Sequence, residues 1–294
     1  MLGKETISRK IFILFNTLFL SLFTLSCLLP FLHVLFSSMS DPAMLARNRG
    51  LLLWPMGFTT KGYSLVAMNP HIVNGLRNTF FYAVAGTTIN ILFTSIGAYV
   101  CAQGKFMLRN LMMFMITFTM FFSGGLIPYY LLVKSLRMDN TFWALLIPSA
   151  ISAYNLILMR TSFSEIPESL EESARIDGAG DFSILFRIIL PVSKPVVAVM
   201  VLLYAVGHWN SWFPALIFLR DRTLFPLQLV LREILINKDA TRIISLANSD
   251  DVTNMYRPLI RYSSIIVSIV PIICVYPFIQ KYFVKGIMIG SIKG

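Results

Sequence analysis

The sequence predicts an all-α membrane protein with six transmembrane helices. Its 294 residues are 56% hydrophobic and only 13% charged, whereas soluble domains carry about 25% charged residues. The apolar residues gather into segments of about 20 residues or more, which is the length that an α-helix needs to cross about 30 Å of hydrocarbon. The mean hydropathy of +0.71 agrees with this pattern. Low charge and long apolar segments together indicate a chain that crosses a bilayer several times.

Six apolar segments give the predicted spans. Their approximate bounds are 11–36, 76–102, 110–133, 141–159, 195–219 and 258–283. The first follows Lys4, Arg9 and Lys10, as the apolar core of a signal peptide does, but such a core is only about 7–15 residues long. We therefore expect this segment to be retained as a transmembrane helix. The third segment is interrupted near Gly124 and again at Pro128, two residue types that weaken helices.

Two connections between the predicted spans are unusually long. They cover residues 160–194 and 220–257, whereas connections of about two to eight residues are common in helical bundles. Long connections often carry function. We expect residues 1–73 to form one transmembrane helix with an external loop. Residues 74–294 are expected to form a core domain with five transmembrane helices.

The net charge of +11 is compatible with binding to nucleic acid or to anionic lipid. The Lys and Arg residues are scattered over short loops and form no basic helix or RNA-binding pattern, so attraction to lipid headgroups explains the charge more simply. They divide almost evenly between the two sides of the membrane, so composition leaves the orientation open. Cys27, Cys101 and Cys274 lie in or beside apolar segments and are expected to be packing residues. The three histidines lie in separate segments and predict no metal site.

The connection after the fourth segment predicts a helix–turn–helix outside the membrane. Pro167 suits the first turn of a helix, and the acidic residues that follow suit its positive end. Gly178 and Gly180 permit a sharp turn. The second helix begins near Asp181, ends near Pro191 and carries apolar residues at i, i+3, i+4 and i+7: Phe182, Leu185, Phe186 and Ile189. The periodicity alone also fits an amphipathic helix that lies on the bilayer.

The spacing of residues in this connection resembles the EAA loop of ABC importer permeases. The matching residues are Glu172-Ser173-Ala174, Gly178 after three more residues, Ile188 after nine, and Leu190-Pro191 after one. Ser173 is the one departure, a small residue in place of the usual alanine. Four further segments resemble the carbohydrate-uptake, maltose-type branch: 124–136, 140–145, 208–213 and 283–294. The likeness covers residues 74–294 and is closest to a subgroup for complex polysaccharides and oligosaccharides, which includes the alginate-type importer.

The resemblance implies a type I ABC importer permease in the bacterial cytoplasmic (inner) membrane, with several spans and both termini in the cytoplasm. The implied partners are a second homologous permease subunit, two ATPase subunits and an external solute-binding protein. Membrane lipid surrounds them, and the implied substrate is an oligosaccharide, including acidic uronate chains such as alginate. This chain has no Gly-x-x-x-x-Gly-Lys-Ser/Thr phosphate loop. ATP and Mg are therefore expected in the ATPase subunits, and we expect neither a cofactor nor an enzyme activity in this chain.

The resemblance also implies roles for residues of the connection at about 165–195, which we call the coupling loop. Glu172 is expected to pair with a basic residue of the ATPase, and Gly178 to make the turn. The full set of expected ATPase-coupling residues is Glu171, Glu172, Ala174, Asp177, Gly178, Phe182, Leu185, Phe186 and Pro191. As the ATPase subunits close, this loop is expected to rock the permease pair between inward-open and outward-open states.

Polar and aromatic residues within the spans are candidates for a solute path. They are Tyr129, Tyr130, Tyr154, Asn155, Trp209, Asn210 and Trp212. Aromatic faces stack on sugar rings and amides bond to hydroxyls, although Tyr and Trp also form belts at membrane interfaces. His208 is expected to be a hydrogen-bonded packing residue. Arginines gather in or beside the connection after the fifth segment: Arg220, Arg222, Arg232, Arg242, Arg257 and Arg261. For these we favour docking of a binding protein over steering of an acidic oligosaccharide.

Three other classes of protein compete with this interpretation. An ABC permease for amino acids or peptides would share the coupling loop, but the carbohydrate-like residues around Asp177 and Lys194 argue against it. An ion-coupled carrier that works alone would need ionisable residues inside its spans, and few are found there. A membrane enzyme would need clustered acid, base or metal ligands, and the sequence shows no such cluster.

Overall fold

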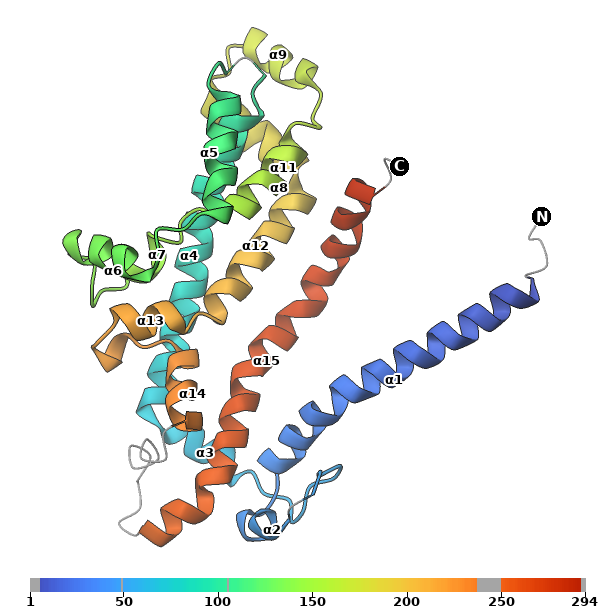
Figure 1. The fold of residues 1–294 in the computed structure, drawn as a ribbon, viewed down its shortest axis with the longest axis vertical. Helices are drawn as coiled ribbons and strands as arrows, with labels where there is room; N and C mark the ends of the chain where they lie inside the picture. The colour runs from blue at the N-terminus through green and yellow to red at the C-terminus, as the bar shows by residue number, and fades with distance from the viewer. Residues whose placement is uncertain (1–5, 49, 105, 237–249, 292–294) are drawn as a thin grey trace. The chain divides into compact units, whose positions relative to one another are not determined.

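The computed structural model describes residues 6–48, 50–104, 106–236 and 250–291, except for the side chains of 250–255, 276 and 278–291. Within these ranges the chain is helical and has no strand (Figure 1). Arg242 and the side chains of 283–294 lie outside the described residues.

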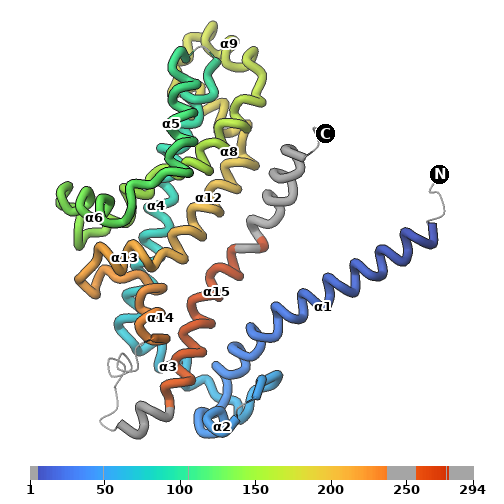
Figure 2. Tube along the Cα trace, viewed as in Figure 1, coloured from blue at the N-terminus to red at the C-terminus, as the bar shows by residue number. Residues whose placement is uncertain are grey.

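Two compact units make up the chain, and each combines two stretches of sequence that Figure 2 traces by colour. They are Met1–Pro70 with Glu233–Ile269, and His71–Arg232 with Val270–Gly294. The domain boundary predicted near residue 73 stays a prediction. Besides the longer helices introduced below, the short elements are α2 (Pro42–Arg47), α9 (Glu168–Ile176), α10 (Asp181–Ile184), the π-helical turn η1 (Leu185–Ile189), α11 (Leu190–Val192), the 3-10 turn η2 (Arg222–Leu224) and α14 (Leu227–Ile236).

Three helices in the described ranges are long and apolar enough to cross a membrane. They are α1 (Ile7–Ser38), α4 (Pro70–Ala102) and the part of α15 (Asp250–Ser291) over Tyr256–Val275. Two bent pairs of helices raise the number to five if each pair is one span. The predicted number of six is not confirmed, because the predicted span over 141–159 is not a single helix.

The third predicted span is broken where its glycines occur. α5 (Arg109–Phe121) and α6 (Leu126–Ser135) meet at an angle of 116°. At the bend, Gly125 has a φ of +84°, which glycine adopts without the clash that a Cβ would cause. The predicted interruption is confirmed, and it is a sharp change of direction rather than a loosened helix.

The fourth predicted span is divided into two short helices. α7 (Trp143–Leu146) makes about one turn, residues 147–152 are not helical, and α8 (Ala153–Phe163) follows. Pro148 lies in the interruption, and proline has no N–H to donate to a helical hydrogen bond. An apolar segment of suitable length therefore does not make one straight span here.

The larger unit is organised along α4, whose buried face is made largely of small and polar residues. They include Gly75, Thr79, Gly86, Thr87, Asn90, Thr94, Ser95 and Ala98. Small residues let helices approach closely in a bilayer. Gly86 makes room for the ring of His208 on α12 (Lys194–Trp209), because a Cβ at Gly86 would lie 2.6 Å from His208 Cε1. The predicted fifth span ends in a separate helix, α13 (Phe213–Phe218).

A hydrophobic cluster joins the coupling loop to the helices of the larger unit. Its buried members are Ala98, Tyr99, Met159, Phe163, Ala174, Ile184, Leu185, Ile189, Met200 and Tyr204. They come from α4, α8, α9, α10, η1 and α12. The coupling loop is therefore part of a folded core, which argues against a helix that merely lies on the bilayer.

The smaller unit holds one end of α1 against α3 (Lys61–Met68) and α15. The Oγ atom of Ser38 lies 2.6 Å from the hydroxyl of Tyr63, and Ser263 donates a hydrogen bond to the carbonyl of Ser38 at 3.4 Å. The most apolar part of α1 is exposed throughout. A helix that is apolar on all sides suits a hydrocarbon environment or a helical partner.

Candidate functional site: the coupling loop

The coupling loop begins with α9, which has an acidic N-terminus. Pro167 takes the N-cap position, and Glu168 and Glu171 lie in the first turn. The helix dipole favours negative charge at this end. Ala174 is buried in the hydrophobic cluster, whereas Glu172 is exposed. One side of α9 therefore packs against the protein, and the other presents a carboxylate outward.

A glycine turn ends α9. Gly178 has a φ of +82° and donates a hydrogen bond from its N–H to the carbonyl of Arg175 at 3.1 Å. The N–H of Ala179 donates to the carbonyl of Ala174 at 2.9 Å. These two bonds and the left-handed residue form a Schellman motif. The turn predicted at Gly178 is confirmed, whereas Gly180 has extended backbone with φ −79° and needs no glycine.

The second half of the loop differs from the predicted regular helix. α10 passes into the π-helical turn η1, in which the N–H of Leu190 bonds to the carbonyl of Leu185, and then into α11. A π-helical turn closes at i→i+5 and shifts the residues that follow around the helix axis. The chain then bends by 90° before α12. The helix ends at Val192, next to Pro191 as predicted.

The apolar residues of this half are divided between two faces. Leu185 is 2% exposed and Ile189 is fully buried, whereas Phe182 is 70% exposed and Phe186 is 43% exposed. The prediction that these four residues form a single apolar stripe is therefore wrong. Leu185 and Ile189 belong to the core of this chain, and Phe182 and Phe186 are available for contacts with another surface. Exposed Ile176 (86%) adds to that outward apolar surface.

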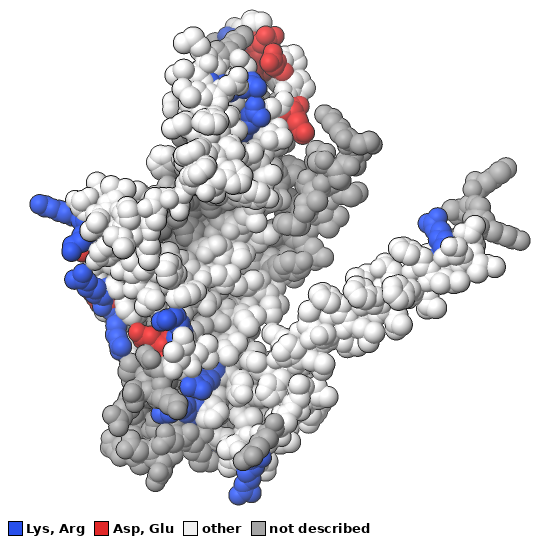
Figure 3. All heavy atoms as spheres, in the orientation of Figure 1, with Lys and Arg blue, Asp and Glu red and all other residues white. Residues whose placement is uncertain are grey.

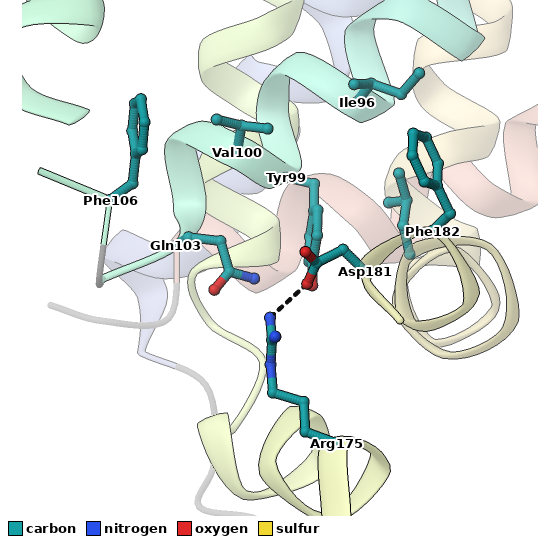
Figure 4. A pocket seen from close by; sticks show the side chains of 9 residues that line it. Ile96, Tyr99, Val100, Gln103, Phe106, Arg175, Asp181 and Phe182 are labelled. Atoms are coloured by element: carbon teal, nitrogen blue, oxygen red, sulfur yellow. Dashed lines mark hydrogen bonds and ion pairs between the residues drawn. The ribbon is translucent and has the colours of Figure 1, made fainter. Parts of the chain in front are cut away.

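Three polar contacts join the loop to α4 and to itself. The Oε2 atom of Glu171 accepts hydrogen bonds from Gln103 Nε2 at 2.7 Å and from the Tyr99 hydroxyl at 3.4 Å. Across the glycine turn, Arg175 forms an ion pair with Asp181 at 2.6 Å (Figure 4). Loss of hydration lowers the pKa of Arg175, but the charge of Asp181 and their hydrogen bond outweigh this loss and raise it overall.

These contacts border a cavity of about 350 Å³. Its apolar lining comes from Ile96, Val100, Phe106, Phe182 and Leu185, and its polar lining from Tyr99, Gln103, Arg175 and Asp181. Figure 3 shows acidic and basic side chains beside one another at the end of the larger unit that carries α9. The exposed carboxylate of Glu172 and the exposed rings of Phe182 and Phe186 give the outward surface of the loop both negative charge and apolar groups. Such a surface suits a partner that has a hydrophobic cleft and basic residues.

The seven candidates for a solute path are not all brought together. Tyr129 and Tyr130 share one neighbour, Phe218, whose ring centroid lies 5.4 Å and 5.9 Å from theirs. Asn155 and Trp209 are 7% and 6% exposed, so they are packing residues in this conformation. The exposed candidates are Tyr129, Tyr154, Asn210 and Trp212.

A buried polar network on α4 was not predicted. His208 Nε2 lies 2.6 Å from Asn90 Oδ1, and the amide nitrogen of Asn90 donates to the carbonyl of Ser149. One turn further, the hydroxyls of Thr94 and Tyr204 lie 2.7 Å apart. The expectation that His208 is a hydrogen-bonded packing residue is confirmed. The sequence does contain a signal for this network, because Asn90 and Thr94 are polar residues four positions apart in an apolar span. Buried polar groups require hydrogen-bond partners.

No group of three or more His, Cys, Asp or Glu residues that could hold a metal ion occurs in the described part of the chain.

The membrane-length apolar helices and the two bent helix pairs indicate a multi-pass membrane protein, and the coupling loop is a folded part of it. Residues 91–289 match the family described as binding-protein-dependent transport system inner membrane component, and the chain belongs to that family. It is therefore a multi-pass inner-membrane permease subunit of the ABC importer class, and not an enzyme.

Relatives with high coverage support the family assignment. The protein LplC of Bacillus subtilis (strain 168) is 40% identical over 292 residues, which cover 99% of this chain and 97% of the relative. The polygalacturonan/rhamnogalacturonan transport system permease protein YtcP of the same organism is 38% identical over 282 residues, covering 94% and 96%. A solved bacterial ABC transporter involved in the import of the acidic polysaccharide alginate has a chain with a TM-score of 0.86 and 32% identity, covering 95% of this chain and 99% of that chain.

Proposed function

We propose that this chain is the membrane-spanning subunit of an ATP-driven importer of oligosaccharides, and that acidic oligosaccharides are its preferred class. Two similar proteins support the sugar class, because one is named for polygalacturonan and rhamnogalacturonan and the other for alginate. Uronate sugars carry a carboxylate on each ring. A permease for them needs an aromatic surface for the ring and a cation for the carboxylate.

The pairing of Trp212 with Arg232 is the observation that carries the acidic preference. Trp212 is 38% exposed and follows the end of α12. The guanidinium carbon of Arg232 lies 5.0 Å from the centroid of its ring, which is a cation–π geometry. The arginine covers one face of the indole, and the exposed part of the side chain is available to a sugar. Because arginine binds carboxylates through two parallel hydrogen bonds, this pair suits a uronate.

The arginines of this part of the chain are not equivalent. Asp221 accepts a hydrogen bond from the N–H of Thr223 at 2.9 Å, which lowers the pKa of its carboxyl. Its negative charge offsets part of the positive charge of Arg220 beside it, so Arg220 attracts anions less than an arginine without an acidic neighbour does. From the sequence we favoured docking of a binding protein for these arginines. The position of Arg232 over a solute-path candidate supports a substrate role for this one.

The remaining features of the proposal concern the assembly. A second homologous permease subunit, two ATPase subunits that bind ATP and Mg, and an external solute-binding protein complete the importer. The coupling loop and both termini face the cytoplasm, and the loop docks on an ATPase subunit through Glu172 and the exposed aromatic residues Phe182 and Phe186. The division into residues 1–73 and 74–294 is part of the same proposal.

The test uses the complete importer in proteoliposomes, with uptake of an oligogalacturonate and of a neutral oligosaccharide of equal length. Arg232→Gln should raise the KM for the acidic substrate about tenfold, the effect of losing one charge-assisted hydrogen bond, and leave neutral uptake unchanged. Arg220→Gln, a matched loss of charge at an exposed arginine, should change neither. If the neutral sugar competes as well as the acidic one in the unaltered importer, the acidic preference is wrong. ATP-dependent uptake tests the permease role separately.

A further inference from the structure

Two adjacent acidic residues of the coupling loop have different environments. Glu172 is exposed, whereas Glu171 is partly buried and directs its carboxylate at the last turn of α4. There it meets two donors that lie one turn apart, Tyr99 and Gln103. A hydrogen bond to an ionised carboxylate is stronger than one between neutral groups. Glu171 is therefore a fixed contact between α9 and α4, and it is not free to meet another protein.

The packing beside Glu171 strengthens this contact. Ala174, one turn along α9, is 7% exposed and lies in the cluster that contains Ala98 and Tyr99 of α4. The same face of α9 thus contributes both an apolar contact and a charged one to α4. Phe106, just beyond α4, and Phe182 line the cavity next to them (Figure 4).

The ion pair across the glycine turn has a smaller role. The side chains of Arg175 and Asp181 are 44% and 64% exposed, and exposed ion pairs contribute little because water screens them. The pair spans the turn between α9 and α10. The stronger link between the loop and the transmembrane helices is the pair of bonds to Glu171.

Further along α4, polar side chains bind the other parts of the larger unit. Thr94 contacts Tyr204 of α12, and Asn90 contacts His208 of α12. Near the opposite end, Asn78 donates to the carbonyls of Thr223 at 2.6 Å and of Phe225 at 3.0 Å. A displacement of α4 therefore acts on α12 and on the segment before α14 through hydrogen bonds that are already formed.

We propose that Gln103 and Tyr99 hold the coupling loop to α4 through Glu171, so that the loop and α4 move as one body during transport. Glu171, Gln103 and Tyr99 are positioning residues, and Glu172 is the residue that meets the ATPase. This inference rests on the proposed function, because it assigns the route by which ATPase movement reaches the spans.

The main test exchanges the two partners of the stronger bond. Gln103→Glu places two carboxylates opposite each other, and the double variant Gln103→Glu with Glu171→Gln restores a carboxylate–amide pair in the reverse direction. In the purified importer in proteoliposomes, Gln103→Glu should keep its ATPase subunits and still hydrolyse ATP. The amount of sugar taken up per ATP hydrolysed should fall at least about fivefold, because typical coupling between two sites changes an equilibrium by about fivefold or more. The double variant should recover most of the loss, which a general packing defect would not.

Further variants keep the proposal falsifiable if the exchange disturbs folding. Gln103→Leu removes the shorter bond and should also lower uptake per ATP, whereas Tyr99→Phe removes only the bond of 3.4 Å and should lower it less. Glu168→Gln removes a charge from an exposed position of the same turn and should have no effect.

Two outcomes would overturn the inference. One is that Gln103→Glu and Gln103→Leu both leave uptake per ATP unchanged. The other is that these two variants lose the ATPase subunits, which is the result expected for substitutions of Glu172. The failure of the proposed function is a different result, since an unaltered chain that retains no ATPase and shows no ATP-driven uptake refutes that function directly.

Discussion

Gly178 carries the strictest conformational requirement in the coupling loop. Its φ of +82° lies in the left-handed region, which costs an L-residue about 1–2 kcal/mol because its Cβ approaches the following carbonyl. Gly178→Ala should therefore reduce the population of the native turn by a factor of about 5–30. The added methyl group meets no atom within 4 Å, so the whole effect comes from the backbone.

Gly180 is a matched control for this substitution. A Cβ added there also meets no atom within 4 Å, but the φ of Gly180 is −79°, which any residue adopts. The two alanine variants thus differ only in backbone strain. Gly178→Asn should fall between them, because asparagine tolerates the left-handed region better than alanine does.

Two measurements follow the turn. The first is ATP-driven uptake in proteoliposomes, which should fall in the order of the strain. The second is trypsin cleavage after Arg175, which should speed up as the turn opens, because both the turn and the Arg175–Asp181 ion pair protect that bond. If Gly178→Ala and Gly180→Ala behave alike in both assays, the turn is not the conformational constraint that we infer from φ.

Two further substitutions test the other contacts. Gly86→Ala places a Cβ 2.6 Å from Cε1 and 2.8 Å from Cδ2 of His208, so it should destabilise the protein by about 1–3 kcal/mol, seen as a lower Tm in detergent. The control is Gly207→Ala on α12, which adds its Cβ in open space and should leave Tm unchanged. An equal decrease in Tm for both variants would show that the contact between α4 and α12 at Gly86 is not tight. Glu172→Lys should leave the chain in the membrane but abolish co-purification of the ATPase. Glu168→Lys, at another exposed position of the same helix, should retain the ATPase, and loss in both variants would point to a general effect of charge.

The sequence was a good guide wherever a local rule determines the structure. Gly178 marks the turn because its backbone conformation excludes other residues, and the glycines near 124 mark the bend between α5 and α6 for a similar reason. The periodicity after Asp181 was misleading, because it predicted neither the π-helical turn over Leu185–Ile189 nor the exposure of Phe182 and Phe186 beside buried Leu185 and Ile189. Nothing in the spacing of these apolar residues indicates a change from i→i+4 to i→i+5 bonding.

Contacts between residues far apart in the sequence could not be predicted. Glu171 and Gln103 are 68 residues apart, and Asn90 and His208 are 118 residues apart, so no local pattern pairs them. The fourth span shows a related limit. Hydropathy measures only how apolar a segment is, and it does not detect that Pro148 and its neighbours leave the helix between α7 and α8.

The bend at Gly125 has a consequence for the lipid around the protein. A helix that stops leaves its last carbonyls unpaired, and the next helix begins with unpaired N–H groups. Hydrocarbon satisfies neither, so irregular backbone at membrane depth is tolerated only beside water or protein. The residues of the joint between α5 and α6 are exposed in this chain, so at membrane depth the joint requires water or a second protein subunit beside it.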